Sequence, residues 1–159
     1  MRGIESSVAV RLPVREVWAR IARPQGLQAL SEAFGGWGSK FRYEVENDAP
    51  LGHGASIAVF SRWNRPVARW QVSGWNPPHE LEMVAVDEDR ILSSYQLTLT
   101  IRLNAEDDDL TQVSVSFVLV FLNKLLEAFS LVLPLRPLYA RRLNRALLLF
   151  REACRRPVA

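Results

Sequence analysis

The stretch LNKLLEAFSLVLPLRPLYARRLNRALLLFREACR, residues 122–155, decides the fold of this 159-residue chain. It is mostly helical in character. Interruptions are expected only near Pro134 and Pro137, because proline lacks a backbone donor and clashes with the preceding turn. Residues 40–121 alternate as consecutive β-strands instead. One long helix after a run of strands predicts a curved sheet that grips a helix, with an apolar space between them.

The second part of this helix is amphipathic. Its apolar residues recur at helical spacing and form one stripe: Tyr139, Leu143, Ala146, Leu147, Phe150 and Cys154. The charged residues lie away from that stripe: Arg141, Arg145, Glu152 and Arg155. Pro137 fits the first turn, where a missing N–H costs nothing. The stripe is therefore expected to pack on the sheet.

The strand with the clearest period of two covers residues 91–103, in which Leu97 and Leu99 alternate with Thr98 and Thr100. After an acidic turn at residues 106–109, the same alternation continues through residues 113–121. Further strands are expected at residues 41–45, 55–63, 67–75 and 80–86. Links this short favour an antiparallel meander with one buried and one wet face.

The first 35 residues complete the pattern. Residues 4–11 predict a first strand, and residues 14–22 and 25–33 predict two short helices in a V around Pro24. The fold class is then α+β: a curved antiparallel sheet of about seven strands wrapped around a long C-terminal helix, with two short helices after the first strand.

Composition bounds the class of protein. With 48% apolar and 23% charged residues, residues 1–159 can bury the core of a single domain. Cys154 is the one cysteine, and the opening residues are too polar for a secretory signal peptide, so a reducing cytoplasm is expected. The most apolar stretch, residues 117–135, carries Asn123, Lys124 and Glu127, which argues against a transmembrane helix.

Three segments resemble a known family. They are VAVRLPVREVW at residues 8–18, LGHG at residues 51–54 and VSGWNPPHEL at residues 72–81. They look like scaffold motifs of the START-like helix-grip (SRPBCC) superfamily, in particular its polyketide cyclase/dehydrase and lipid-transport group, and the likeness covers nearly the whole chain. The resemblance implies a hydrophobic cavity between the sheet and the last helix. That group shares no catalytic signature, so no catalytic residue is carried over.

Candidates for the cavity wall follow from alternation and from the helical stripe. They are Trp37, Phe60, Trp70, Tyr95, Leu97, Phe117, Phe129, Leu133 and Tyr139. Trp70 faces the side opposite Arg69, where it either lines a cavity or fills the core. Trp37 lies in a glycine-rich loop, as an entrance residue or as surface packing. The hydroxyl groups of Tyr95 and Tyr139 either orient a ligand or bond the backbone.

Arg69 and Glu82 are the polar candidates for the cavity. If they faced it together with Glu80, they would be placed for acid–base work in an aldol-type cyclisation. The alternative is a solvated edge with a surface ion pair. His53 and His79 lie in separate turns with no third ligand nearby in the sequence, so neither a metal site nor a cofactor is expected.

Residues 136–156 hold seven arginines against one acid, Glu152. Such a segment meets solvent, an acidic partner, anionic lipid or nucleic acid. Nucleic acid is not expected, because binding it needs many phosphate contacts on one face. A solvated helix face is therefore expected. Docking on a lipid surface is the alternative, because Leu138, Leu148 and Leu149 lie off the apolar stripe and add exposed apolar area.

Three functions remain. The favoured one is binding or carrying a hydrophobic small molecule, such as a lipid or polyketide, without catalysis. The second is an aromatase/cyclase-type enzyme that acts on a polyketide-like substrate. The third is an interaction protein that docks on a membrane or an acidic partner through its arginine-rich C-terminal helix.

Overall fold

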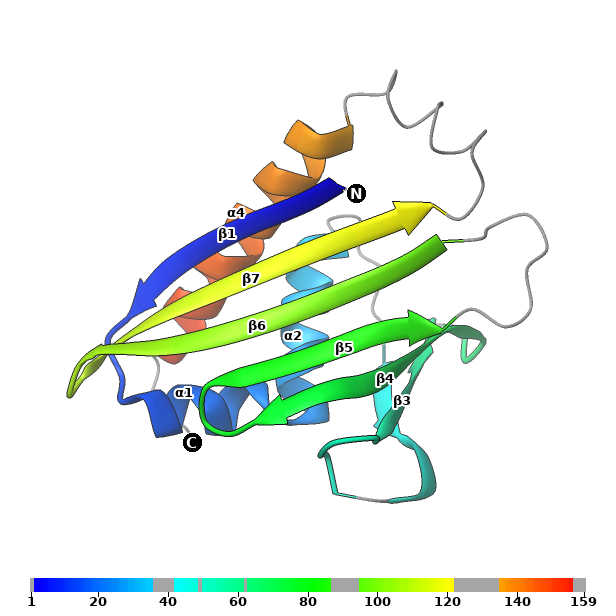
Figure 1. The fold of residues 1–159 in the computed structure, drawn as a ribbon, viewed down its shortest axis with the longest axis horizontal. Helices are drawn as coiled ribbons and strands as arrows, with labels where there is room; N and C mark the ends of the chain where they lie inside the picture. The colour runs from blue at the N-terminus through cyan, green and yellow to red at the C-terminus, as the bar shows by residue number, and fades with distance from the viewer. Residues whose placement is uncertain are drawn as a thin grey trace.

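The computed structural model describes residues 2–35, 42–48, 50–61, 63–86, 95–121 and 135–155. Within these residues the chain forms a strand, two helices, six strands and a final helix (Figure 1). The elements are β1 (Arg2–Val10), α1 (Val14–Ile21), α2 (Pro24–Gly35), β2 (Arg42–Val45), the short 3₁₀ turn η1 (Glu46–Asp48), β3 (Ser56–Phe60), β4 (Pro66–Asn76), β5 (Glu80–Val86), β6 (Tyr95–Asp107), β7 (Leu110–Phe121) and α4 (Leu135–Cys154).

The seven strands form one antiparallel sheet in the order β1-β7-β6-β5-β4-β3-β2. All neighbours are consecutive in the chain except β1, which pairs with β7. Ile101 of β6 lies opposite Val115 of β7, so inward-facing residues of adjacent strands meet in pairs. The predicted α+β helix-grip architecture is confirmed.

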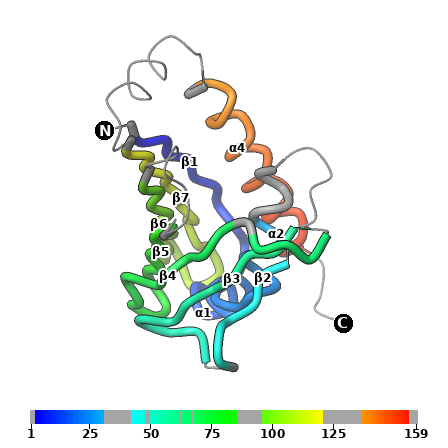
Figure 2. Tube along the Cα trace, turned by 90° about the vertical axis from the view of Figure 1, so that its right-hand side faces the viewer, coloured from blue at the N-terminus to red at the C-terminus, as the bar shows by residue number. Residues whose placement is uncertain are grey.

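The three helices of the described residues lie on one face of the sheet, and α4 stands opposite the long strands (Figures 1 and 2). The predicted stripe of α4 is its buried side: Leu143, Ala146, Leu147, Phe150 and Cys154 are buried and Tyr139 is half-buried. Pro137 lies in the first turn, as expected. None of the described helices is long and apolar enough to cross a membrane.

The other face of the sheet is polar. Three ion pairs lie on or beside it: Arg42 Nε–Glu44 Oε1 at 2.7 Å, Arg69 Nε–Glu46 Oε1 at 2.9 Å and Arg102 Nε–Glu80 Oε2 at 2.7 Å. Their side chains are partly or largely exposed, so each pair contributes at most about 1 kcal/mol. The stability of the sheet therefore comes from its inner face.

Several strand boundaries differ from expectation by one to four residues, and the ends of β3 and β6 differ for a clear physical reason. β3 ends at Phe60 instead of residue 63, because Ser61 and Arg65 close a turn through a 2.8 Å backbone hydrogen bond. β6 continues to Asp107, which pairs with Leu110, so the acidic turn is tighter than residues 106–109. The expected kink near Pro134 and the strand start at residues 91–94 lie outside the described residues.

α1 and α2 meet at a very close approach. Trp18 of α1 packs edge-on against Trp75 of β4, with ring centroids 5.0 Å apart, and this contact seats α1 on the sheet. Gly26, in the first turn of α2, passes over the backbone of α1. A Cβ atom at position 26 would lie 1.9 Å from the carbonyl oxygen of Arg20. Only glycine permits this contact.

We predict that Gly26→Ala destabilises the protein by about 1–3 kcal/mol or more, because α2 must move away from α1. The gain in helix propensity of about 1 kcal/mol does not offset a backbone clash of this size. Urea unfolding measures the difference. Gly52→Ala is the control, since the nearest atom to its added Cβ is 4.0 Å away. Equal stability of the two variants would contradict the α1–α2 contact.

Candidate functional site

A partly enclosed cavity of about 150 Å³ lies between the inner face of the sheet and helices α2 and α4. Residues from both helices and from the strands line it: Leu27, Leu30, Tyr43, Trp70, Met83, Leu97, Leu99, Ile101, Val115, Phe117, Leu143 and Ala146. This is the position at which a helix-grip protein was expected to hold a ligand.

The floor of the cavity is built by β6 and β7. Leu97, Leu99 and Ile101 alternate with polar residues, so all three point to the same face. The pairing places Phe117 opposite Leu99 and Val115 opposite Ile101. Two adjacent apolar rows therefore form one continuous surface.

The helices provide the opposite wall. Leu27 and Leu30 are one turn apart on α2, and Leu143 and Ala146 are one turn apart on α4, so each pair projects from one side of its helix. Ala146 is buried, with 1% of its surface exposed. Its single methyl group leaves room that a larger side chain would occupy.

The chemistry of the wall is apolar. Among the described lining residues only Tyr43 carries a polar group in addition to the Trp70 indole N–H. An apolar cavity of roughly 150 Å³ accommodates a molecule the size of benzene, whereas pockets for drug-sized ligands measure about 300–1,000 Å³. The described cavity thus fits a single ring or a short alkyl segment.

Three of the predicted wall residues lie in this wall: Trp70, Leu97 and Phe117. Trp70 is buried, with 9% of its surface exposed, and belongs to the core cluster as well as to the cavity. Trp70 therefore fills the core and lines the cavity at the same time.

Phe60 lies elsewhere, which corrects its assignment to the cavity. Ile57 and Val59 are the buried residues of β3, and Phe60 has the opposite parity. The guanidinium carbon of Arg42 lies 5.1 Å from the centre of its ring. Phe60 is an apolar residue on the polar face, half-buried and covered in part by an arginine.

Arg69 and Glu82 also lie on the polar face, so they do not line the described cavity. The inward neighbours Trp70 and Met83 force the residue before each of them outward. Glu82 Oε1 accepts a 2.8 Å hydrogen bond from Ser73 Oγ, and Arg69 is in its ion pair with Glu46. The structure therefore favours the surface alternative over acid–base work inside the cavity.

The remaining candidates are placed in part. Tyr139 is half-buried on the stripe of α4 but is not among the described residues that line the cavity. Tyr95 begins β6, and the orientation of its side chain is not described. Trp37, Phe129 and Leu133 lie outside the described residues.

His79 connects the β4–β5 corner to β6 through its backbone and its ring. Its backbone N–H donates to the Asn76 carbonyl at 2.7 Å, its carbonyl accepts from the Leu103 N–H at 2.8 Å, and its Nδ1 lies 3.3 Å from the Leu103 oxygen. These contacts tie the β4–β5 corner to β6. In the part of the chain that the structure describes, no group of three His, Cys, Asp or Glu residues is arranged to hold a metal ion.

Sequence reasoning missed nine lining residues: Leu27, Leu30, Tyr43, Met83, Leu99, Ile101, Val115, Leu143 and Ala146. Most carried a usable signal. Leu99 and Ile101 share the parity of Leu97, and Val115 shares that of Phe117. The residues of α4 lie on the predicted stripe, whereas no local pattern shows which of the buried residues border an empty space.

No protein-family model matches the sequence, and no curated protein matches it. Many solved structures are similar, three of which follow. A protein from Arthrobacter aurescens, solved by solution NMR, is 14% identical with a TM-score of 0.63 over 98% of this chain and 87% of that chain. A norcoclaurine synthase mutant from Thalictrum flavum, in complex with a transition-state analogue, is 13% identical. Its TM-score is 0.61 over 96% of this chain and 95% of that chain. CalU16 from Micromonospora echinospora is 15% identical, with a TM-score of 0.52 over 96% of this chain and 83% of that chain.

At identities this low the likeness shows the fold alone. The chain has the helix-grip fold, with a seven-stranded antiparallel sheet and a C-terminal helix laid along its inner face. The resemblance seen in the sequence is supported at that level.

Cys154 marks the C-terminal end of the buried stripe. It is 6% exposed, and burial raises the pKa of its thiol, against the smaller lowering effect of the Arg20 charge. Thiols react as thiolates. We therefore predict that alkylation of Cys154 at pH 8 is at least about tenfold slower in the native protein than in urea. Equal rates, followed by mass spectrometry, would show that the end of α4 is not docked.

The same burial gives a pH dependence of stability. The native state binds the thiol proton more tightly than the unfolded state, whose cysteine has a pKa of about 8.5. This contribution is fully present below that pH and is lost as pH rises through the raised native pKa. We expect the urea midpoint to fall more between pH 8 and 10 in the wild type than in Cys154→Ala. Parallel curves for the two proteins would contradict a buried thiol.

Proposed function

We propose that this protein binds or carries a hydrophobic small molecule in the cavity between the sheet and α4. The observation that carries the proposal is the apolar wall itself, which leaves about 150 Å³ unfilled in the middle of an otherwise packed core. Cores normally contain few voids larger than a water molecule. A cavity of this size costs stability unless a ligand fills it.

The wall favours a ligand with a ring or short chain at its buried end. Trp70 and Phe117 offer aromatic surface, and Tyr43 adds a hydroxyl group. Burial of about 200 Å² of apolar surface gains about 5 kcal/mol. Association costs of about 4 kcal/mol or more offset most of this. A ring alone therefore binds weakly, and a tighter natural ligand needs atoms beyond the ring.

The finer assignment is to the polyketide cyclase/dehydrase and lipid-transport group, as a single cytoplasmic domain. The segments at residues 8–18, 51–54 and 72–81 support it. So does the fold, since a structure of norcoclaurine synthase in complex with dopamine and hydroxybenzaldehyde, two small ring compounds, has a TM-score of 0.58 to this chain at 12% identity. That likeness keeps a cyclase-type enzyme as the second candidate. Tyr43 is its first residue to test, because it is the one described lining residue that carries a hydroxyl group.

A filled-cavity variant tests the proposal. Ala146→Leu adds three carbon atoms inside the cavity, whereas Ala153→Leu adds the same atoms on the exposed side of the same helix. We expect small aromatic probes such as indole to shift the NMR signals of the wild type and of Ala153→Leu. The same titration should leave Ala146→Leu at least about tenfold weaker, since the space is occupied.

Equal affinity of Ala146→Leu and wild type would overturn this site. In a separate experiment, native mass spectrometry of protein purified from its own cells identifies the class of the natural ligand. A bound apolar mass supports the carrier function. Turnover of that molecule by the wild type but not by Tyr43→Phe would favour the enzyme instead.

A further inference from the structure

The side of α4 that points away from the sheet has an unusual composition. We name it the outer face of α4 and define it by Leu138, Arg141, Arg145, Leu148 and Leu149. Their spacing of three, four, three and one residues places them on one side of the helix. The three leucines are 46%, 47% and 49% exposed, and both arginines are exposed.

Single exposed leucines need no explanation, but a contiguous group does. The packing requirement of α4 is already met by its buried stripe, which includes Leu143 and Leu147 on the opposite side. The leucines of the outer face do not belong to the core cluster of the described residues. Their presence between arginines indicates a surface that meets both apolar and anionic groups.

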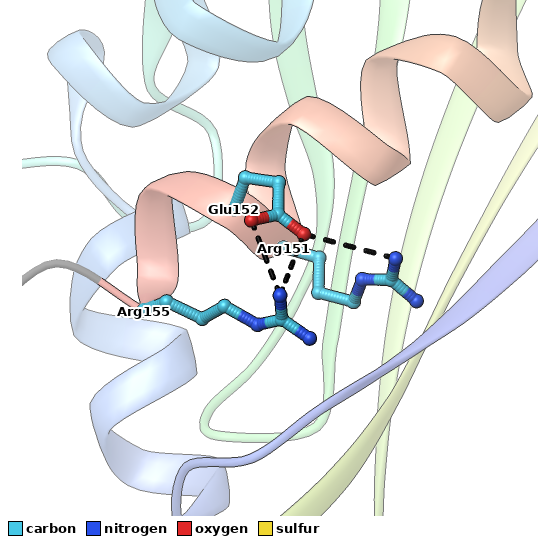
Figure 3. A network of polar contacts seen from close by, with 3 residues as sticks. All are labelled: Arg151, Glu152 and Arg155. Atoms are coloured by element: carbon cyan, nitrogen blue, oxygen red, sulfur yellow. Dashed lines mark hydrogen bonds and ion pairs between the residues drawn. The ribbon is translucent and has the colours of Figure 1, made fainter.

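The outer face is also strongly cationic. Glu152 is the one acidic residue of α4, and it is already engaged by arginines (Figure 3). Arg155 Nη1 lies 3.0 Å from one of its carboxylate oxygens and 3.2 Å from the other, and Arg151 Nη2 lies 3.8 Å away. Among the described residues, no carboxylate forms an ion pair with Arg141 or Arg145.

We propose that the outer face of α4 docks on an anionic lipid surface. Its leucines enter the boundary between headgroups and acyl chains, while Arg141 and Arg145 bind lipid phosphates through charge-assisted hydrogen bonds. Guanidinium groups on long apolar stems reach the phosphate level while the neighbouring leucines lie deeper. This inference goes beyond ligand binding and does not depend on it.

Charge argues against a second copy of the chain as the occupant. A twofold contact through this face brings the same patch of both copies together. Arg141 and Arg145 would then face their equivalents, and the only carboxylate of each α4 is already shared by two arginines. An anionic bilayer complements the arginines and accepts the leucines at the same time.

Helix α4 lies between the proposed lipid surface and the cavity. Leu143 and Ala146 line the cavity from the inner side of the same helix that carries the outer face. Docking therefore leaves one helix between the lipid surface and the cavity. A carrier that collects or delivers an apolar ligand at a membrane needs this arrangement.

Vesicle flotation tests the proposal with the full chain. We expect binding to vesicles of phosphatidylcholine mixed with phosphatidylglycerol, little binding to phosphatidylcholine alone, and loss of binding as salt screens the arginines. Leu148→Ser/Leu149→Ser and Arg141→Gln/Arg145→Gln should each weaken binding at least about tenfold. Arg15→Gln/Arg65→Gln removes the same charge from exposed positions on α1 and in the β3–β4 turn, and should bind like the wild type.

The proposal is overturned if the wild type does not float, if it floats equally with both vesicle types, or if the outer-face variants bind like the control. A doubled mass in light scattering that is lost in Leu148→Ser/Leu149→Ser would assign the face to a second copy instead. Circular dichroism verifies that each variant is folded. The indole titration should be unchanged in the leucine variant, so failure of docking and failure of cavity binding are distinguishable.

Discussion

Burial of one stripe of α4 against the inner face of the sheet is the interaction on which the rest of the structure depends. Leu143, Leu147 and Phe150 are buried there, opposite strands whose alternate residues are equally apolar. The stripe closes the core over most of its length. The cavity lies between the two surfaces, and Ala146, Val115 and Phe117 are among the residues that line it.

Much of this follows from two periodicities in the sequence. A period of two over residues 91–103 and 113–121 defines which side of β6 and β7 is buried. A helical period over residues 139–154 defines the stripe of α4. Leu97 and Phe117 were therefore predicted at the cavity because their parity is fixed by their strands. The same parity argument places Arg69 and Glu82 outward, since Trp70 and Met83 point inward.

The sequence does not predict features that arise from contacts between distant elements. Phe60 is apolar, yet it lies on the polar face at the end of a short strand, where Arg42 covers its ring. The cavity volume depends on how closely α2 approaches the sheet. The placement of α2 against α1 depends on Gly26 passing over the carbonyl of Arg20, a contact that no local pattern reveals. The exposed leucines of α4 were visible as residues off the stripe. Only the structure shows that Arg141 and Arg145 beside them form no ion pair with a carboxylate of the described residues.

The central claim is that the unfilled space between α4 and the sheet is where an apolar ligand lies. Intermolecular nuclear Overhauser effects between bound indole and the protein methyl groups test this most directly. The account predicts cross-peaks to Leu143 on α4 and to Val115 and Leu99 on the sheet in the same complex, because these residues face one cavity. Cross-peaks confined to the exposed Leu148 and Leu149 would contradict it, since the ligand would then lie on the surface of α4 and not inside the fold.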